Sequence, residues 1–174
     1  MEVRVRRESA ADASLIKAVT RQAFLTATHT SHTEHLIVDA LRQAGALAVS
    51  LVAEAGGTVI GHVGVSPVAI SDGTAGWFGL GPISVLPRQQ RRGVGSKLMH
   101  AALGLLRDRN AAGCVVLGEP AFYSRFGLQP YPDLVLAGAP PEYFQAICFD
   151  ARHPRGTVTY HAAFAVREPP EGRG

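Results

Sequence analysis

Residues 83–109 constrain this chain most, because they combine an apolar strand, a glycine turn and an amphipathic helix in direct succession. The stretch opens with the apolar segment ISVL, which ends at Pro87. A basic polar loop then leads to GVG at residues 93–95. After the glycines, apolar residues recur at helical spacing: Leu98, Met99, Ala102, Leu103, Leu105 and Leu106. The pattern predicts a buried strand, a loop, and a helix that begins just after the glycines.

The start of this helix is a natural site for an anion. Its first N–H groups have no partner within the helix and carry the positive end of the helix dipole. Glycine allows close approach of the backbone, and Arg88, Arg91 and Arg92 add positive charge at the same point. A dinucleotide fingerprint is excluded because Leu98 stands where its third glycine is required. A nucleoside-triphosphate loop is excluded because no glycine stands five residues before Gly95.

The composition predicts one globular domain. The chain has 174 residues, of which 47% are apolar, and no apolar run approaches the ~20 residues of a membrane span. The first residues lack the apolar centre of a signal peptide, so we expect a cytoplasmic protein without a membrane partner. Cys114 and Cys148 lie far apart in apolar stretches, which favours buried free thiols. The net charge of +3 is modest, so nucleic acid is not an expected partner.

Other patterns predict how the remaining elements are ordered. We expect strands at residues 3–6, 47–54, 59–70, 75–86, 114–117, 134–136, 143–149 and 157–166, and helices at about 12–24, 36–45, 96–109 and 120–126. Gly56-Gly57 indicates a tight hairpin. Gly79, Gly81 and Pro82 within one strand favour a bulge or a splay. The last two strands are expected to pair with each other in antiparallel fashion.

Two motifs in this order resemble the GNAT superfamily of acetyl-CoA-dependent N-acetyltransferases. Gln90-x-x-Gly93-x-Gly95, after a Val-x-Pro strand end, is similar to the pyrophosphate loop of that family. The segment from Tyr123 to Leu128 is similar to its Tyr-x-x-x-Gly-Phe segment, with Leu128 where Phe is usual. The order of elements resembles the GNAT fold along nearly the whole chain.

The resemblance implies one α/β domain over residues 1–166. Its mixed sheet would be mostly antiparallel, with a splayed central strand and flanking helices. For the polar residues 167–174 we expect a disordered tail.

The same resemblance implies acetyl-CoA as cosubstrate, held mostly by backbone. The splayed strand would receive the pantetheine arm at Ile83 and Val85. The loop would bind the pyrophosphate through these residues: Gln90, Arg91, Arg92, Gly93, Val94, Gly95 and Ser96. Elementary considerations point to the same places, because a strand edge and a helix N-terminus both present unpaired backbone donors.

The reaction implied is attack of an amine on a thioester, which needs a proton acceptor and a proton donor. An alkyl amine with a pKa of ~10 must first lose a proton, and the leaving thiol has a pKa of ~8.5. The resemblance implies Tyr123 as the general acid. The alternative is a structural role, in which a backbone carbonyl holds the hydroxyl of Tyr123.

The proton acceptor is less evident, because residues 75–85 contain no Asp or Glu. Glu34 is the only acid in the polar segment HTSHTEH at residues 29–35. The resemblance to the GNAT fold implies that this segment borders the acceptor pocket. We expect Glu34 to attract a cationic amine and Glu34 or Glu119 to relay its proton. The alternative for Glu119 is to cap the helix that begins at Pro120.

Three histidines in the same segment have a spacing that suggests a metal site: His29, His32 and His35. The segment is polar and offers no clear second shell, so we expect no metal. Instead, His29 and His32 are expected to line the substrate pocket with Glu34.

The sequence therefore predicts transfer of acetyl from acetyl-CoA to an amine of a small molecule or peptide. Two alternatives stay open. The missing strand carboxylate leaves open an acyl-CoA-binding sensor without catalysis, and the basic loop is also compatible with a nucleotide- or nucleic-acid-binding module.

Overall fold

The computed structural model describes residues 1–168, and its elements follow the predicted order closely. The strands are β1 (Val3–Arg7), β2 (Val49–Ala55), β3 (Thr58–Pro67), β4 (Ala69–Ile70), β5 (Trp77–Val85), β6 (Gly113–Leu117), β7 (Leu134–Val135), β8 (Phe144–Cys148) and β9 (Gly156–Thr159). The helices are α1 (Ala13–Phe24), α2 (Glu34–Gln43), α3 (Val94–Asp108) and α4 (Pro120–Tyr123). Short 3-10 helices are η1 (Ala10–Asp12), η2 (Pro87–Gln89), η3 (Ser124–Phe126), η4 (Pro141–Tyr143) and η5 (Ala162–Ala165). Of the predicted tail, residues 169–174 lie outside the described residues.

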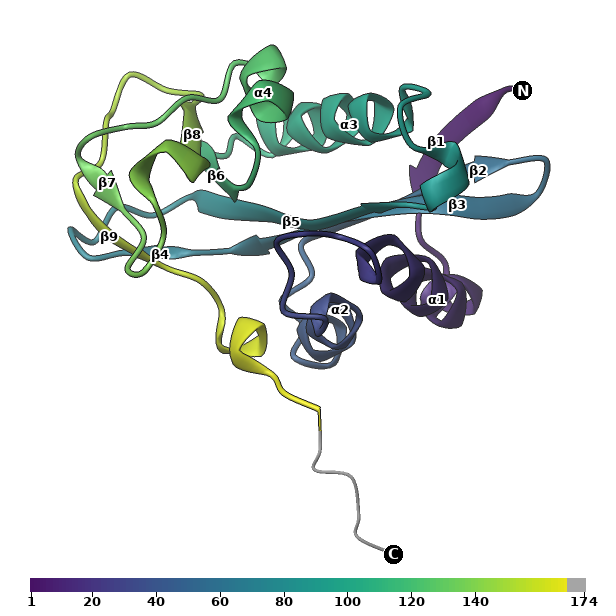
Figure 1. The fold of residues 1–174 in the computed structure, drawn as a ribbon. Coiled ribbons are helices and arrows are strands. Elements are labelled where there is room, and N and C mark those ends of the chain that lie inside the picture. The colour runs from purple at the N-terminus through teal and green to yellow at the C-terminus, as the bar shows by residue number, and fades with distance from the viewer. Residues whose placement is uncertain (169–174) are drawn as a thin grey trace, which may run out of the picture.

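A six-stranded sheet in the order β1-β2-β3-β5-β6-β8 forms the centre of the fold. Neighbouring strands are antiparallel except β5 and β6, which run parallel. Helices α1 and α2 cover one face of the sheet, and α3 and α4 lie on the other (Figure 1). The predicted class, a mixed and mostly antiparallel sheet between flanking helices, is confirmed.

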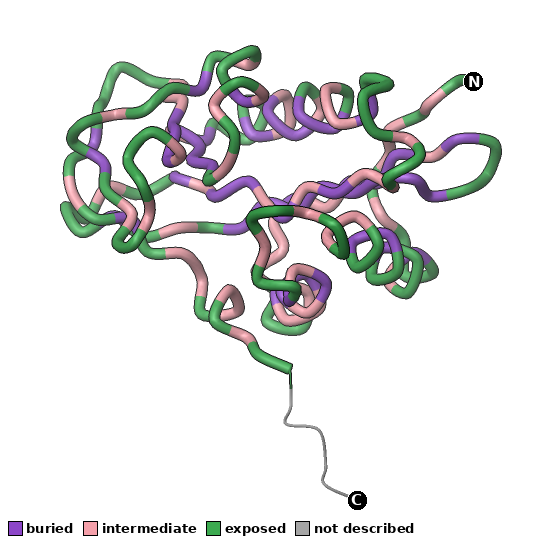
Figure 2. Tube along the Cα trace, in the orientation of Figure 1, coloured by how far each residue is buried: buried purple, intermediate pink, exposed green. Residues whose placement is uncertain are grey.

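The apolar stripe predicted for α3 is buried against this sheet. Four of its large side chains are at most 2% exposed, namely Leu98, Met99, Leu103 and Leu106, whereas Leu105 is only partly buried. They belong to a core shared with β2, β3 and β6. Figure 2 shows buried positions recurring along α3. Burial of each such side chain stabilises the folded state by about 2 kcal/mol. These contacts hold α3 on the sheet and fix its N-terminus beside the end of β5.

β5 is splayed from β6, as its glycines and proline predict. Its ladder with β3 extends from Phe78 to Val85, with a register irregularity opposite residues 63–65. Its parallel ladder with β6 covers only residues 77–79, which lie opposite residues 113–115. Beyond Gly79, the edge of β5 that faces β6 has no strand partner within residues 1–168.

The prediction that residues 143–149 and 157–166 form an antiparallel pair is wrong. β8 pairs with β6, whereas β9 lies between β4 and β7 in a small separate sheet. The second half of the expected strand is helical: η5 follows, and His161 caps it by accepting a hydrogen bond from the Ala163 N–H at 3.0 Å. Alternating apolar residues indicate a strand but do not identify its partner.

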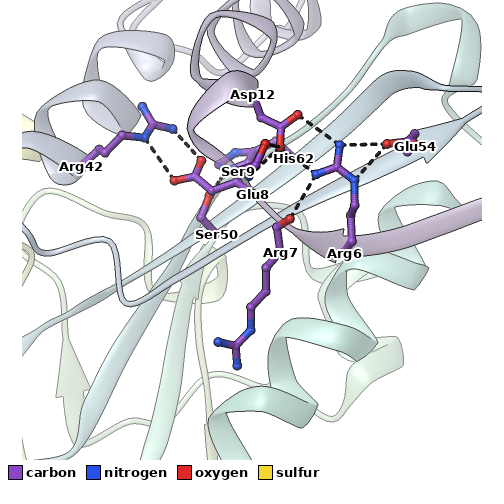
Figure 3. Close-up of polar contacts among 9 residues, drawn as sticks. All are labelled: Arg6, Arg7, Glu8, Ser9, Asp12, Arg42, Ser50, Glu54 and His62. Carbon is purple, nitrogen blue, oxygen red and sulfur yellow. Dashed lines mark hydrogen bonds and ion pairs between the residues drawn. The ribbon is translucent and has the colours of Figure 1, made fainter.

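A network of ion pairs ties the N-terminal strand to the rest of the domain (Figure 3). Arg6 of β1 contacts Asp12 of η1 at 2.7 Å and Glu54 of β2 at 2.8 Å. Arg42 of α2 contacts Glu8 at 2.7 Å. Because these residues are only partly exposed and share partners, the network fastens η1 and α2 to the edge of the sheet.

Both cysteines are free, as predicted. Cys114 is fully buried in β6, whereas Cys148 at the end of β8 is partly exposed and so is less buried than expected. None of the helices within residues 1–168 combines the length and the apolar character of a membrane span.

Candidate active site

The loop between β5 and α3 presents a row of backbone N–H groups. Arg91 and Gly93 take left-handed conformations, with φ of 60° and 81°. Within residues 1–168 we find no well-formed hydrogen bond from the N–H groups of residues 91–96, and Lys97 is the first to donate, to the Gly93 C=O at 3.0 Å. Successive N–H groups at such a turn, continued by a helix N-terminus, form a concave site for an anion.

Gly93 and Gly95 serve this loop in different ways. Gly93 is the N-cap of α3, and no atom lies within 4 Å of the place a Cβ would take, so its left-handed φ is the reason for glycine. At Gly95, a Cβ would lie 3.3 Å from Cζ of Phe122 in α4. Gly95 therefore allows α4 to pack against the first turn of α3.

The side chains of the loop divide between the anion site and the strand. Arg88, Arg91 and Arg92 are exposed, and none forms an ion pair within the described part of the chain. The amide Nε2 of Gln90 donates to the Val85 C=O at 3.1 Å. Gln90 thus faces the end of β5 and already occupies one carbonyl of the expected pantetheine surface.

The open edge of β5 includes Ile83 and Val85. The Leu86 N–H donates to the Ile60 C=O of β3 at 2.9 Å. Backbone groups of successive strand residues point to alternate edges, so those of Ile83 and Val85 face the gap beside β6. Except for the Val85 carbonyl, these are the backbone groups that the sequence predicted to be open.

Tyr123 lies in α4, beside the end of β6. Its ring covers Gly118, where a Cβ would lie 2.6 Å from Cε2, and the residue is only 8% exposed. Burial, with a smaller contribution from the Cys114 thiol, raises the pKa of Tyr123 to about 12. We find no hydrogen-bond partner for its hydroxyl in residues 1–168. The structural alternative for Tyr123 required a backbone carbonyl that accepts a hydrogen bond from this hydroxyl, and none of the described residues provides one.

The turn from β6 into α4 contains Glu119 and depends on Gln145. Glu119 occupies the N-cap position, but its exposed side chain makes no capping hydrogen bond. The C=O of Gly118 accepts a hydrogen bond from Nε2 of Gln145 in β8 at 3.2 Å, and Gln145 is 1% exposed. Gln145 was not predicted from the sequence, although a lone amide in the apolar strand FQAIC is a signal for a buried hydrogen bond.

Glu34 begins α2 and lines a hollow of about 270 Å³ beside α1. Its Oε1 accepts hydrogen bonds from Thr30 Oγ1 and from the Ser31 N–H, whereas Oε2 is buried without a partner in residues 1–168. The hollow is lined by Arg21, Phe24, Leu25, His32, Glu34, His35 and Glu168. Burial lowers the pKa of His35, with the positive charges of Arg21 and Lys17 acting in the same direction.

His29 lies apart from this hollow. Its ring centroid is 6.3 Å from that of Tyr143, whose C=O accepts from the Gly118 N–H at 2.9 Å. The structure therefore brings His32 and Glu34 together but places His29 nearer to the end of β6. Within the described residues, no three metal-ligating side chains form a cluster.

Comparisons with known proteins agree with this geometry. Residues 15–128 match the Acetyltransferase (GNAT) family. The chain is 36% identical over 126 residues to the uncharacterized N-acetyltransferase YhbS of Escherichia coli K12, and the match covers 72% of each chain.

Solved structures give the same relationship over more of the chain. A GNAT family acetyltransferase from Brucella melitensis, in complex with acetyl-CoA, is 44% identical with a TM-score of 0.84, covering 94% of this chain and 98% of that one. YhbS of Escherichia coli, in complex with CoA, is 32% identical with a TM-score of 0.87, covering 95% and 93%. PaiA N-acetyltransferase from Thermoplasma acidophilum, at 14% identity and a TM-score of 0.64, shares the fold over 86% of this chain and 100% of that one.

Proposed function

Because the chain belongs to the GNAT family of acetyltransferases, we propose that it transfers the acetyl group of acetyl-CoA directly to an amine of a small molecule or a peptide. The family makes it an acetyl-CoA-dependent acyltransferase, and the proposed part is the acceptor. The observation that carries the proposal is the row of N–H groups at residues 91–96 beside the open edge of β5. An anion site next to a strand edge suits an extended arm that ends in a pyrophosphate.

The relatives support acetyl-CoA as the cosubstrate. The Brucella melitensis and Escherichia coli structures contain acetyl-CoA and CoA, and each match covers more than nine tenths of this chain. In the proposal, the N–H groups of residues 91–96 bind the pyrophosphate. The exposed side chains of Arg91 and Arg92 attract the phosphates electrostatically, and salt weakens this attraction. Ile83 and Val85 hold the arm along β5.

Tyr123 acts in the proposal on the leaving side of the reaction. Acetyl-CoA, when bound, supplies a thioester whose sulfur must leave. With the pKa of Tyr123 at about 12 and that of a thiol at ~8.5, complete proton transfer from the hydroxyl would be uphill by about 5 kcal/mol. Tyr123 therefore acts mainly as a hydrogen-bond donor to the sulfur and gives up its proton late.

The amine side rests on acidic groups near the polar segment that precedes α2. The buried Oε2 of Glu34 has no partner in residues 1–168 and can attract a cationic amine into the hollow beside His32. Glu34 or Glu119 then accepts the proton that the amine loses. His29 lines the approach near the end of β6.

Calorimetry and thiol release test this function in two steps. We expect acetyl-CoA to bind the wild-type protein, and thiol release to rise with at least one amine among spermidine, tyramine, lysine and a peptide with a free N-terminus. Binding without any turnover would favour the acyl-CoA sensor. Absence of binding would overturn the proposal.

A pair of glycine variants tests the loop itself. Gly93→Val should abolish binding, because a side chain there fills the space that the anion requires. Gly138→Val is a matched control, since Gly138 has φ of 80° against 81° for Gly93 and both have open space at the Cβ position. Equal loss of affinity in both variants would indicate backbone strain and not a blocked anion site.

A further inference from the structure

Tyr160 packs directly on the backbone of the splayed strand. A Cβ at Gly79 would lie 2.5 Å from Cε1 and 3.1 Å from Cδ1 of Tyr160, so the ring already occupies that space. The ring of Phe164 in η5 lies 4.9 Å behind it, centroid to centroid. The segment after β9 therefore inserts an aromatic side chain where residue 79 has none.

This contact lies at the inner end of the gap between β5 and β6. Gly79 forms the last pair of the parallel ladder, opposite Val115. An arm that binds along β5 from the phosphate loop would end here, because β6 rejoins β5 at this pair.

Tyr160 and Tyr123 lie on opposite faces of the sheet. Phe78 and Leu80 belong to the core with α3, and Tyr123 belongs to the same core. Since successive strand residues point to opposite faces, Gly79 faces the side that carries α1 and α2. Tyr160 therefore lies on the face opposite α3, the helix whose N-terminus forms the proposed pyrophosphate site.

The hydroxyl of Tyr160 is a neutral donor that has no partner within residues 1–168. Burial raises its pKa well above the ordinary range, and interactions with Cys114 and Tyr123 act in the same direction. Two protonated tyrosines without protein acceptors thus lie along the gap, Tyr160 over Gly79 at its inner end and Tyr123 over Gly118 just beyond β6.

On the basis of the proposed function, we propose that Tyr160 is an additional active-site residue whose hydroxyl donates a hydrogen bond to the carbonyl oxygen of the acetyl group. Tyr123, on the other face of the sheet, then donates its hydrogen bond to the thioester sulfur. A donor fixed at the carbonyl oxygen stabilises the negative charge that develops there during acyl transfer. Gly79 is glycine because the ring of Tyr160 requires its space.

Binding of acetyl-CoA and of CoA separates this role from a structural one, because only acetyl-CoA carries the carbonyl oxygen. Calorimetry on the wild-type protein and Tyr160→Phe gives the ratio of the two dissociation constants. We expect the preference for acetyl-CoA over CoA to fall roughly three- to tenfold in Tyr160→Phe, with the affinity for CoA itself unchanged. Tyr160→Phe keeps the ring against Gly79, so the fold and melting temperature should be preserved.

Tyr131→Phe is the matched control, since it removes a tyrosine hydroxyl that instead accepts from the Cys148 N–H at 3.2 Å. It should leave the acetyl-CoA preference unchanged. If Tyr160→Phe binds acetyl-CoA and CoA in the wild-type ratio, the role of Tyr160 is refuted while the proposed function stands. If the wild-type protein binds neither compound, the proposed function itself fails.

Discussion

Acidification should destabilise this protein through one buried residue, His62. His62 of β3 is 0% exposed, and its Nε2 lies 2.8 Å from Oγ of Ser50 (Figure 3). Its Nδ1 has no partner within residues 1–168. A charged imidazole would be poorly solvated in this position, and burial lowers the pKa of His62 to about 4.

The pKa difference fixes the sign and size of the effect. An unfolded histidine has a pKa of ~6.5, so the unfolded chain takes up the proton before the native protein does. Neutral His62 contributes fully to the free energy of unfolding above about pH 6.5, and this contribution is lost as the pH falls toward 4. The difference between the unfolded and native pKa values corresponds to about 3 kcal/mol of unfolding free energy, of which about 2 kcal/mol is lost by roughly pH 5.

Urea unfolding at about pH 7.5 and pH 5 measures this loss. The wild-type free energy of unfolding should fall by about 2 kcal/mol more than that of His62→Gln, which does not titrate and can still bond Ser50. Arg6 holds the pKa of Asp12 low, so that carboxylate keeps its contribution over this range. His100→Gln on the exposed side of α3 is the control and should behave like the wild type. An equal loss in His62→Gln and the wild type would refute the reasoning.

The remaining predictions concern catalysis with whichever amine the panel identifies. Tyr123→Phe should lower kcat by roughly 10²-fold or more with acetyl-CoA affinity unchanged, and full activity would return Tyr123 to a structural role. Glu34→Gln should raise the KM for a cationic amine if Glu34 binds it. Loss of the proton acceptor, in Glu34→Gln or Glu119→Gln, should instead lower kcat and move the pH profile upward. Unchanged parameters in both variants would mean that water accepts the proton.

Features encoded by adjacent residues were predictable from the sequence. The strand, loop and helix at residues 83–109 follow from one apolar run, two glycines and a helical period. Gly81 and Pro82 weaken a ladder, and β5 indeed leaves β6 at this point. The partner of β9 was predicted wrongly, because alternation defines which side chains are buried and carries no information on the neighbouring strand.

The acceptor side depends on residues that are distant in sequence. Glu34 and His32 share their hollow with Arg21 of α1 and with Glu168, and only the folded chain brings these together. His29 belongs to the same polar segment but lies near Tyr143. A segment that changes direction within a few residues can send neighbours to different sites, and hydrophobic periodicity does not report such turns.

Gly79 shows how a correct local prediction can miss its cause. The sequence suggested that glycine at this position accompanies a bulge, and the register of β5 is indeed irregular. The contact at 2.5 Å from Tyr160 gives a more specific reason, which lies 81 residues further along the chain. If the ring excludes a side chain at residue 79, Gly79→Ala should disturb the fold less when Tyr160 is also replaced by alanine, because the overlap is then removed. The same contact leaves no room for a carboxylate at residue 79, because the ring of an aromatic residue from the C-terminal segment fills that space.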